Sequence, residues 1–156
     1  MKTSATTDPR GAALPEKTEK SASTTLQCQS SLPHRILVVD DDPFVRQLNT
    51  LILNGAGYRV DAAEDGVVAW DLLRMNRYDL LVTDNNMPEV SGVELIKKLR
   101  AAGMALPVIM ATGKSPEEDC TPHLWLQIAV TLLLKPYTAE EFLGTVRKAL
   151  ARPPPS

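Results

Sequence analysis

The chain has 156 residues, a formal net charge of −2 and 44% hydrophobic residues, enough for one domain with a buried core plus flanking tails. A charge this close to neutral provides no concentrated basic face, so the composition does not predict direct nucleic-acid binding. No apolar run is long enough to span a bilayer, and the amino terminus lacks the apolar core of a secretory signal. We therefore expect a soluble cytoplasmic protein without membrane insertion.

Composition divides the chain into three parts. Residues 1–33 are rich in Ser, Thr, Ala, Lys and Glu and contain almost no large apolar side chains, so they are predicted to form a disordered extension. Residues 34–151 alternate apolar runs with amphipathic stretches and are predicted to form one folded domain. Residues 152–156 are a Pro-rich carboxyl-terminal tail.

The folded part is expected to begin with an apolar strand over 35–39. Asp42 followed by Pro43 is typical of a helix start, and this helix is predicted to run to Asn54, before Gly55 and Gly57. Its predicted buried stripe consists of Val45, Leu48 and Ile52.

Strands and helices are expected to alternate through the rest of the domain. The strands are predicted over 58–62, 79–83, 107–111 and 130–134. The helices are predicted over 66–76, 91–101, 122–128 and from Thr138 onward, with capping boxes at Ser91/Glu94 and Thr138/Glu141. Five such strand–helix units predict an α/β fold with a doubly wound parallel sheet.

Polar side chains follow four of the predicted strands at the point where each strand ends. They are the Asp40–Asp42 cluster, Asp84, Thr112 and Lys135. Because the carboxyl ends of parallel strands form the ligand crevice of an open α/β sheet, these side chains are expected to meet there. Carboxylates, a hydroxyl and an ammonium together predict a site for a divalent metal and a phosphoryl group. His34 and His123, in contrast, have no partner at a useful spacing.

The same residues resemble the receiver domain of two-component response regulators. The resemblance runs from about Arg35 to Ala151, and its motifs stand in the order Ile36–Asp42, Asp79–Asp84, Met87–Pro88 with Gly92, Ala111–Thr112 and Lys135–Pro136. It implies a flavodoxin-like fold with five parallel strands in the order 2-1-3-4-5 and helices on both faces.

The resemblance makes Asp84 the phosphoacceptor, whose carboxylate attacks a phosphoryl group and forms an acyl phosphate. It also implies bound Mg²⁺ (or Mn²⁺), held by Asp41, Asp84 and the backbone carbonyl of Asn86, with Asp40 acting through water. The chemistry of the residues agrees, because clustered carboxylates favour a hard, oxygen-seeking cation.

Two further residues receive roles at the phosphoryl group. Lys135 supplies a compact positive charge to one phosphoryl oxygen, and Thr112 supplies a hydroxyl to another. Gly113, next to Thr112, is expected to leave room for the group. Phosphoryl transfer needs little more than such positioning and charge neutralisation.

The chain departs from the family pattern in the region of its switch. Leu132 stands three residues before Lys135, where receivers often carry Tyr or Phe, so the usual coupling of the Thr hydroxyl to an aromatic ring is in question. Pro122 and the missing Gly-Ala turn indicate a shortened fourth helix. Trp125 lies on the face that receivers use for targets and dimers, and it is a candidate partner anchor beside the plainer interpretation of core packing.

The resulting hypothesis is a stand-alone receiver, a signalling domain and not an enzyme. It would accept a phosphoryl group from a sensor histidine kinase or a histidine phosphotransfer protein. It would then bind a downstream protein target, relay the group or form a homodimer. One alternative is a receiver-like module that binds partners without phosphorylation. A more distant alternative is an aspartyl-phosphate phosphatase, since Asp40 and Asp42 are spaced like the acids of such enzymes.

Overall fold

The computed structural model describes residues 32–113 and 130–152. The chain divides into two units, Met1–Pro33 and His34–Ser156, and every helix and strand named below belongs to the second. The predicted helix over 122–128, with Trp125, and the greater part of both predicted tails lie outside the described residues. Among the described helices, none combines the length and the apolar character needed to cross a bilayer.

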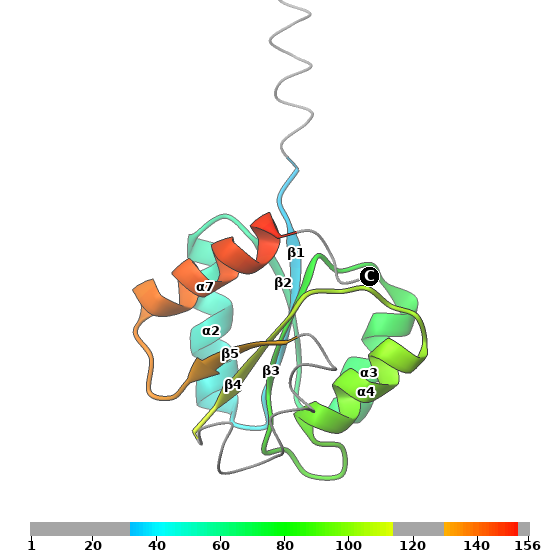
Figure 1. The fold of residues 1–156 in the computed structure, drawn as a ribbon. Coiled ribbons are helices and arrows are strands. Elements are labelled where there is room, and N and C mark those ends of the chain that lie inside the picture. Colours follow the sequence, from blue (N-terminus) through cyan, green and yellow to red (C-terminus); the bar gives the residue numbers. More distant parts are fainter. Residues whose placement is uncertain (1–31, 114–129, 153–156) are drawn as a thin grey trace, which may run out of the picture. The chain divides into compact units, whose positions relative to one another are not determined.

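Strands and helices alternate along the described chain (Figure 1). Their order is β1 (Arg35–Val39), α2 (Pro43–Gly55), β2 (Arg59–Ala63), α3 (Gly66–Met75), β3 (Leu80–Asp84), α4 (Gly92–Ala101), β4 (Val108–Thr112), β5 (Val130–Leu134) and α7 (Ala139–Ala151).

The five strands form one parallel sheet in the order β2-β1-β3-β4-β5, which confirms the predicted doubly wound topology. In Figure 1, α2 and α7 lie on one face of the sheet, and α3 and α4 lie on the other. The central strands β1 and β3 pair in a register that places Val39 opposite Thr83. The residues that follow these two strands therefore emerge side by side at the carboxyl edge of the sheet.

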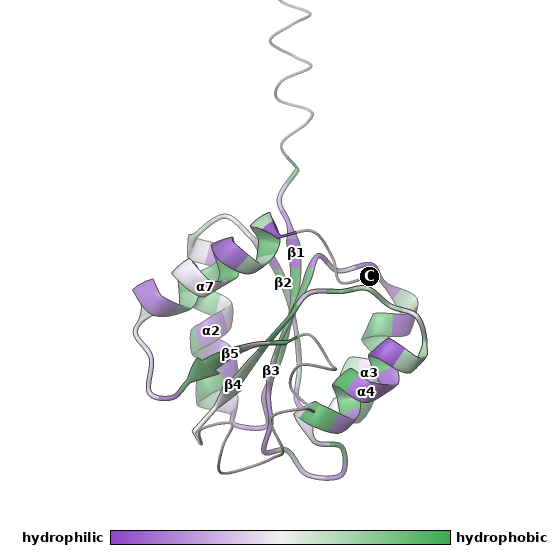
Figure 2. Cartoon of the chain, viewed as in Figure 1, coloured by the Kyte–Doolittle hydropathy of each residue, from purple (hydrophilic) through white to green (hydrophobic). Residues whose placement is uncertain are grey.

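The core has two layers because successive side chains of a strand point to opposite faces of the sheet. On β1, Leu37 and Val39 pack into the layer beneath α3 and α4, whereas Ile36 and Val38 pack into the layer beneath α2 and α7. Figure 2 shows the strands coloured as hydrophobic between helices of mixed polarity. Such continuous apolar strands are typical of parallel sheets covered on both faces.

The predicted buried stripe of α2 is wrong in one member. Leu48 is 57% exposed, and the residues of α2 that are buried are Asn49 and Leu53. Asn49 points inward because its side-chain amide donates a 3.0 Å hydrogen bond to the hydroxyl of Tyr137. The helix is consequently rotated relative to the prediction, and Leu48 faces outward.

Each described helix begins at a side-chain cap. Asp42 accepts hydrogen bonds from the first backbone amides of α2, and Asp65 does the same for α3. Both predicted capping boxes are confirmed, with Ser91 and Glu94 opening α4 and Thr138 and Glu141 opening α7. These caps fix where the helices start relative to the strand ends that precede them.

Candidate functional site

Three carboxylates gather at the carboxyl ends of β1 and β3. One oxygen from each of Asp40, Asp41 and Asp84 can be chosen so that all three lie within 4.8 Å of one another. Asp40 and Asp84 are only 3% and 8% exposed, whereas Asp41 is open to solvent. The predicted meeting of these acids is therefore confirmed, and a hard divalent cation with oxygen ligands suits this donor set.

Lys135 supplies the positive charge that faces these acids. Its Nζ lies 3.3 Å from Asp84 Oδ1 and 3.7 Å from Asp40 Oδ2. Burial by itself would lower the pKa of Lys135, but the two carboxylates outweigh it and raise the pKa above its ordinary value. The ammonium therefore stays charged where it meets Asp84.

Asp40 carries the electrostatic cost of this arrangement. Burial is the largest influence on the pKa of Asp40 and raises it above the ordinary value. Repulsion from the charges of Asp84 and Asp41 raises this pKa further. A hydrogen bond of 2.9 Å from the backbone amide of Asp42 and the charge of Lys135 act in the opposite direction. A bound divalent cation would relieve the remaining repulsion between these carboxylates.

The backbone around Asp84 is held by the start of α4. The amide of Asn85 donates a 2.9 Å hydrogen bond to Asp84 Oδ1, and the Asn85 carbonyl accepts one of 3.1 Å from Gly92. The Asn85 side-chain oxygen also accepts a hydrogen bond from the amide of Val93, at 3.3 Å. Gly92 is required here, because a Cβ at this position would overlap the carbonyl oxygen of Asp84.

Arg46 is a site residue that the sequence interpretation missed. From the first turns of α2, its Nη1 donates a 2.8 Å hydrogen bond to the backbone carbonyl of Asp40. This contact fixes the strand end that carries Asp40 and Asp41. In the sequence, the only sign of this role is that Arg46 lies one turn into the helix that follows the acidic cluster. An ordinary surface arginine could occupy the same position.

The remaining predicted residues lie around the same edge. Thr112 ends β4 and is 4% exposed, and its carbonyl accepts a 2.8 Å hydrogen bond from the amide of Lys135. Beside it, a Cβ on Gly113 would meet no other described residue within 4 Å. Leu132 is half-buried on β5 and packs against the core layer of α3 and α4. Asn86 is exposed in the loop after β3, and its part as a carbonyl ligand stays a prediction.

Comparison with known proteins gives one consistent result. The family model described as the response regulator receiver domain matches residues 36–147. The response regulator MprA of Mycobacterium sp. strain KMS is 40% identical over 124 residues, which are 80% of this chain and 54% of that protein. The MprA of Mycobacterium avium strain 104 is 39% identical over 121 residues, 78% of this chain and 53% of that protein. The chain thus spans about half the length of these curated relatives.

Solved structures show the same likeness. The chemotaxis response regulator CheY4 of Vibrio cholerae has a TM-score of 0.70 and 30% identity, over 76% of this chain and 99% of that one. The response regulator TrrA of Thermotoga maritima, solved with Mg²⁺ and beryllium fluoride, has a TM-score of 0.67 and 32% identity. It covers 74% of this chain and 98% of its own.

Proposed function

The chain belongs to the family of response regulator receiver domains, and on that premise we propose that Asp84 accepts a phosphoryl group in a magnesium-dependent reaction. The observation that carries this proposal is the contact of Lys135 with Asp84 and Asp40 inside a cluster of three carboxylates. Asp40, Asp41, Asp84 and the carbonyl of Asn86 would hold Mg²⁺. When bound, the ion neutralises charge on the carboxylates and on the incoming phosphoryl oxygens.

In the proposed reaction an Asp84 carboxylate oxygen attacks the phosphorus of a phosphohistidine. The new bond is an acyl phosphate, and the phosphorus–nitrogen bond of the donor breaks, its electron pair leaving with the imidazole. Lys135 would move with the developing charge, since its ammonium already lies within 3.3 Å of Asp84. Thr112 would donate its hydroxyl to a phosphoryl oxygen on the side of Gly113, where a Cβ would meet no described residue within 4 Å.

The phosphodonor is proposed to be a sensor histidine kinase or a histidine phosphotransfer protein that contacts α2. Phe44, Leu48 and Leu51 are 84%, 57% and 61% exposed, and their spacing of four and three residues puts them on one face of the helix. This apolar face begins three residues after Asp41. A protein that presents its phosphohistidine to Asp84 would be able to bury this apolar face of α2 in the interface.

The output of the domain is proposed to be binding of a protein target, relay of the phosphoryl group or formation of a homodimer.

A second candidate function is a module that binds partners without phosphorylation. Leu132 favours it, because a branched aliphatic side chain packed against the core provides no aromatic ring for the switch that receivers commonly use.

The proposal is tested by incubating the protein with Mg²⁺ and acetyl phosphate and recording its intact mass. We expect a gain of one phosphoryl group that disappears without metal and in Asp84→Asn. Asp79→Asn is the matched control, because Asp79 lies just before the other end of β3 and should leave the gain unchanged.

A short-lived acyl phosphate would escape the mass measurement, so a second readout is needed. Beryllium fluoride with Mg²⁺ should shift the amide resonances around Asp84 and Thr112 in the wild-type protein. Absence of both the mass gain and the resonance shifts would refute phosphorylation and favour the constitutive binding module. Sustained hydrolysis of a phosphate ester that is lost in Asp40→Asn but kept in Asp84→Asn would favour a phosphatase.

A further inference from the structure

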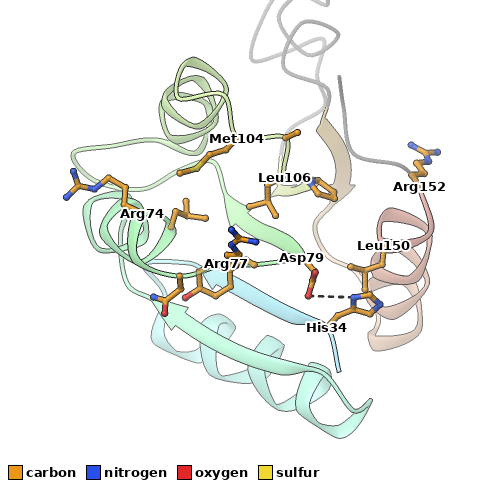
Figure 3. Close-up of a pocket in the computed structure, with 13 residues that line it drawn as sticks. His34, Arg74, Arg77, Asp79, Met104, Leu106, Leu150 and Arg152 are labelled. Carbon is orange, nitrogen blue, oxygen red and sulfur yellow. Dashed lines mark ion pairs between the residues drawn. The ribbon is translucent and has the colours of Figure 1, made fainter. Parts of the chain in front are cut away.

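A hollow of about 540 Å³ lies at the amino edge of the sheet, opposite the carboxylate cluster. His34 and Asp79 come from the starts of β1 and β3, Leu106 comes from the loop before β4, and Leu150 comes from the end of α7. Figure 3 shows these side chains surrounding a common space, with Arg77 near its middle. The volume falls within the range of small-molecule sites, roughly 300–1,000 Å³.

The charges around this hollow are unbalanced in favour of cations. Asp79 is engaged, because His34 Nδ1 lies 3.6 Å from its Oδ2, and the same oxygen accepts a 2.8 Å hydrogen bond from the backbone amide of Arg35. The sequence analysis predicted no partner for His34, and the contact between His34 and Asp79 shows that this prediction was wrong. Arg77 and Arg152 also line the hollow, and neither forms an ion pair or a hydrogen bond with any other described residue. In Figure 3 the Arg77 side chain lies in the common space, whereas the Arg152 guanidinium lies beyond Leu150 and points away from it. One guanidinium group, that of Arg77, therefore remains for an anion, in a chain whose net charge is −2.

The floor of the hollow is apolar and its rim is well anchored. Leu73 is 5% exposed, and Met104 and Leu106 are half-buried beside it. Arg100 holds the rim by donating hydrogen bonds to the carbonyls of Met104 and Leu106, at 3.0 and 2.8 Å. The turn that opens this loop uses Gly103 at a φ of 75°, a conformation that glycine adopts at little cost.

We propose that this hollow binds a small amphipathic anion, with a compact apolar body and a single acidic group. The apolar body would cover Leu73 and Leu106, and the acidic group would pair with Arg77, whose planar guanidinium group matches carboxylate, sulfonate or phosphate oxygens. A neutral apolar molecule would leave Arg77 without a partner. A strongly hydrated inorganic anion would gain nothing from the floor.

This site is independent of phosphoryl transfer. Asp79 and Asp84 stand at opposite ends of β3, a strand of five residues. At about 3.3 Å per residue, the five steps from Asp79 to Asp84 span roughly 16 Å. A small ligand on Arg77 therefore makes no contact with the metal or with the phosphoryl group, and the proposal stands or falls separately from the proposed function.

The probe for the test is anilinonaphthalene sulfonate, a fluorescent aromatic molecule with one sulfonate. Phenylnaphthylamine, which has the same ring system without the acidic group, is the control ligand. The test variant is Arg77→Gln. The matched control variant, Arg147→Gln, removes one exposed arginine that does not line the hollow.

We expect saturable binding of one sulfonate probe, with amide resonance shifts over residues 73–79 and 104–106. Affinity should fall roughly tenfold or more in the test variant, because the charge-assisted contact with Arg77 is lost, and should change less than twofold in the control variant. The neutral ligand should bind more weakly than the sulfonate. Phosphorylation by acetyl phosphate should be the same in all these proteins.

Three results would overturn the proposal. The first is equal affinity of the test and control variants for the sulfonate probe. The second is binding of the neutral ligand as tight as that of the sulfonate. The third is a set of resonance shifts centred on the exposed face of α2 formed by Phe44, Leu48 and Leu51, which would place the probe on that surface instead.

Discussion

Substitution of Gly92 by Ala should loosen the attachment of α4 to the phosphoacceptor strand. The added Cβ would overlap the Asp84 carbonyl oxygen and lie 3.0 Å from the Cα of Asn85. Both neighbours are backbone, so neither can turn aside, and the start of α4 must move. Overpacking of this kind costs about 1–3 kcal/mol, and weakening the 3.1 Å hydrogen bond from Gly92 to Asn85 adds about 1 kcal/mol. We expect a total loss of about 2–4 kcal/mol in the free energy of unfolding.

Urea unfolding followed by far-ultraviolet circular dichroism measures this loss. With a slope of about 1.5 kcal/mol per molar urea, the midpoint should fall by roughly 1–3 M. Gly144→Ala is the matched control, because a Cβ there would meet no described residue of another element within 4 Å and the residue lies inside α7. It should raise the free energy of unfolding by about 1 kcal/mol, since Ala is the better helix former. Shifts of the same sign in both variants would refute the argument from backbone contact.

Three other predictions concern single residues. Burial, together with the hydrogen bond that the Tyr78 hydroxyl donates to Asp61, raises the pKa of Tyr78 to about 12. The contribution of Tyr78 to the free energy of unfolding is therefore complete below about pH 10 and is lost as the pH rises through 12. An ultraviolet titration should show a late phenolate step that Tyr78→Phe removes, and a Tyr78→Phe titration identical to wild type would contradict this. Glu89 has a φ of 67°, so Glu89→Gly should stabilise the fold by about 0.5–1 kcal/mol in a thermal melt, whereas a loss would disprove strain at this position. Lys135→Met removes the cation that faces Asp84. Calorimetry should therefore show roughly fivefold tighter Mg²⁺ binding, while formation of the acyl phosphate falls. Weaker Mg²⁺ binding together with less acyl phosphate would argue against the role assigned to Lys135.

Local patterns were sufficient to predict the order and type of the described elements. Continuous apolar runs such as Leu80–Thr83 belong to strands covered on both faces, and caps such as Ser91 mark helix starts. The meeting of Asp40 and Asp84 followed as well, because parallel topology alone brings the ends of neighbouring strands together.

Polar contacts between distant residues could not be predicted in this way. Asn49 is buried because Tyr137, 88 residues further along the chain, accepts its hydrogen bond. Counting apolar positions along α2 assigned Leu48 to the core, since the count has no means of recognising a satisfied polar residue. Arg46 escaped notice for the same reason, because its partner is a backbone carbonyl, which no side-chain pattern records.

The capped helix starts have a consequence for what the carboxyl edge of this sheet can hold. Many α/β proteins that bind nucleotides grip a phosphate with free backbone amides at a helix amino terminus. Here Asp42 accepts hydrogen bonds from the amides of Phe44 and Val45, and the Ser91 hydroxyl accepts the one from Glu94. With those donors engaged, these two helix starts cannot grip a phosphate, and we expect a phosphoryl group at this edge to depend on Lys135, the Thr112 hydroxyl and a bound cation. The capped helix starts thereby disfavour the kind of phosphate contact on which many nucleotide sites depend.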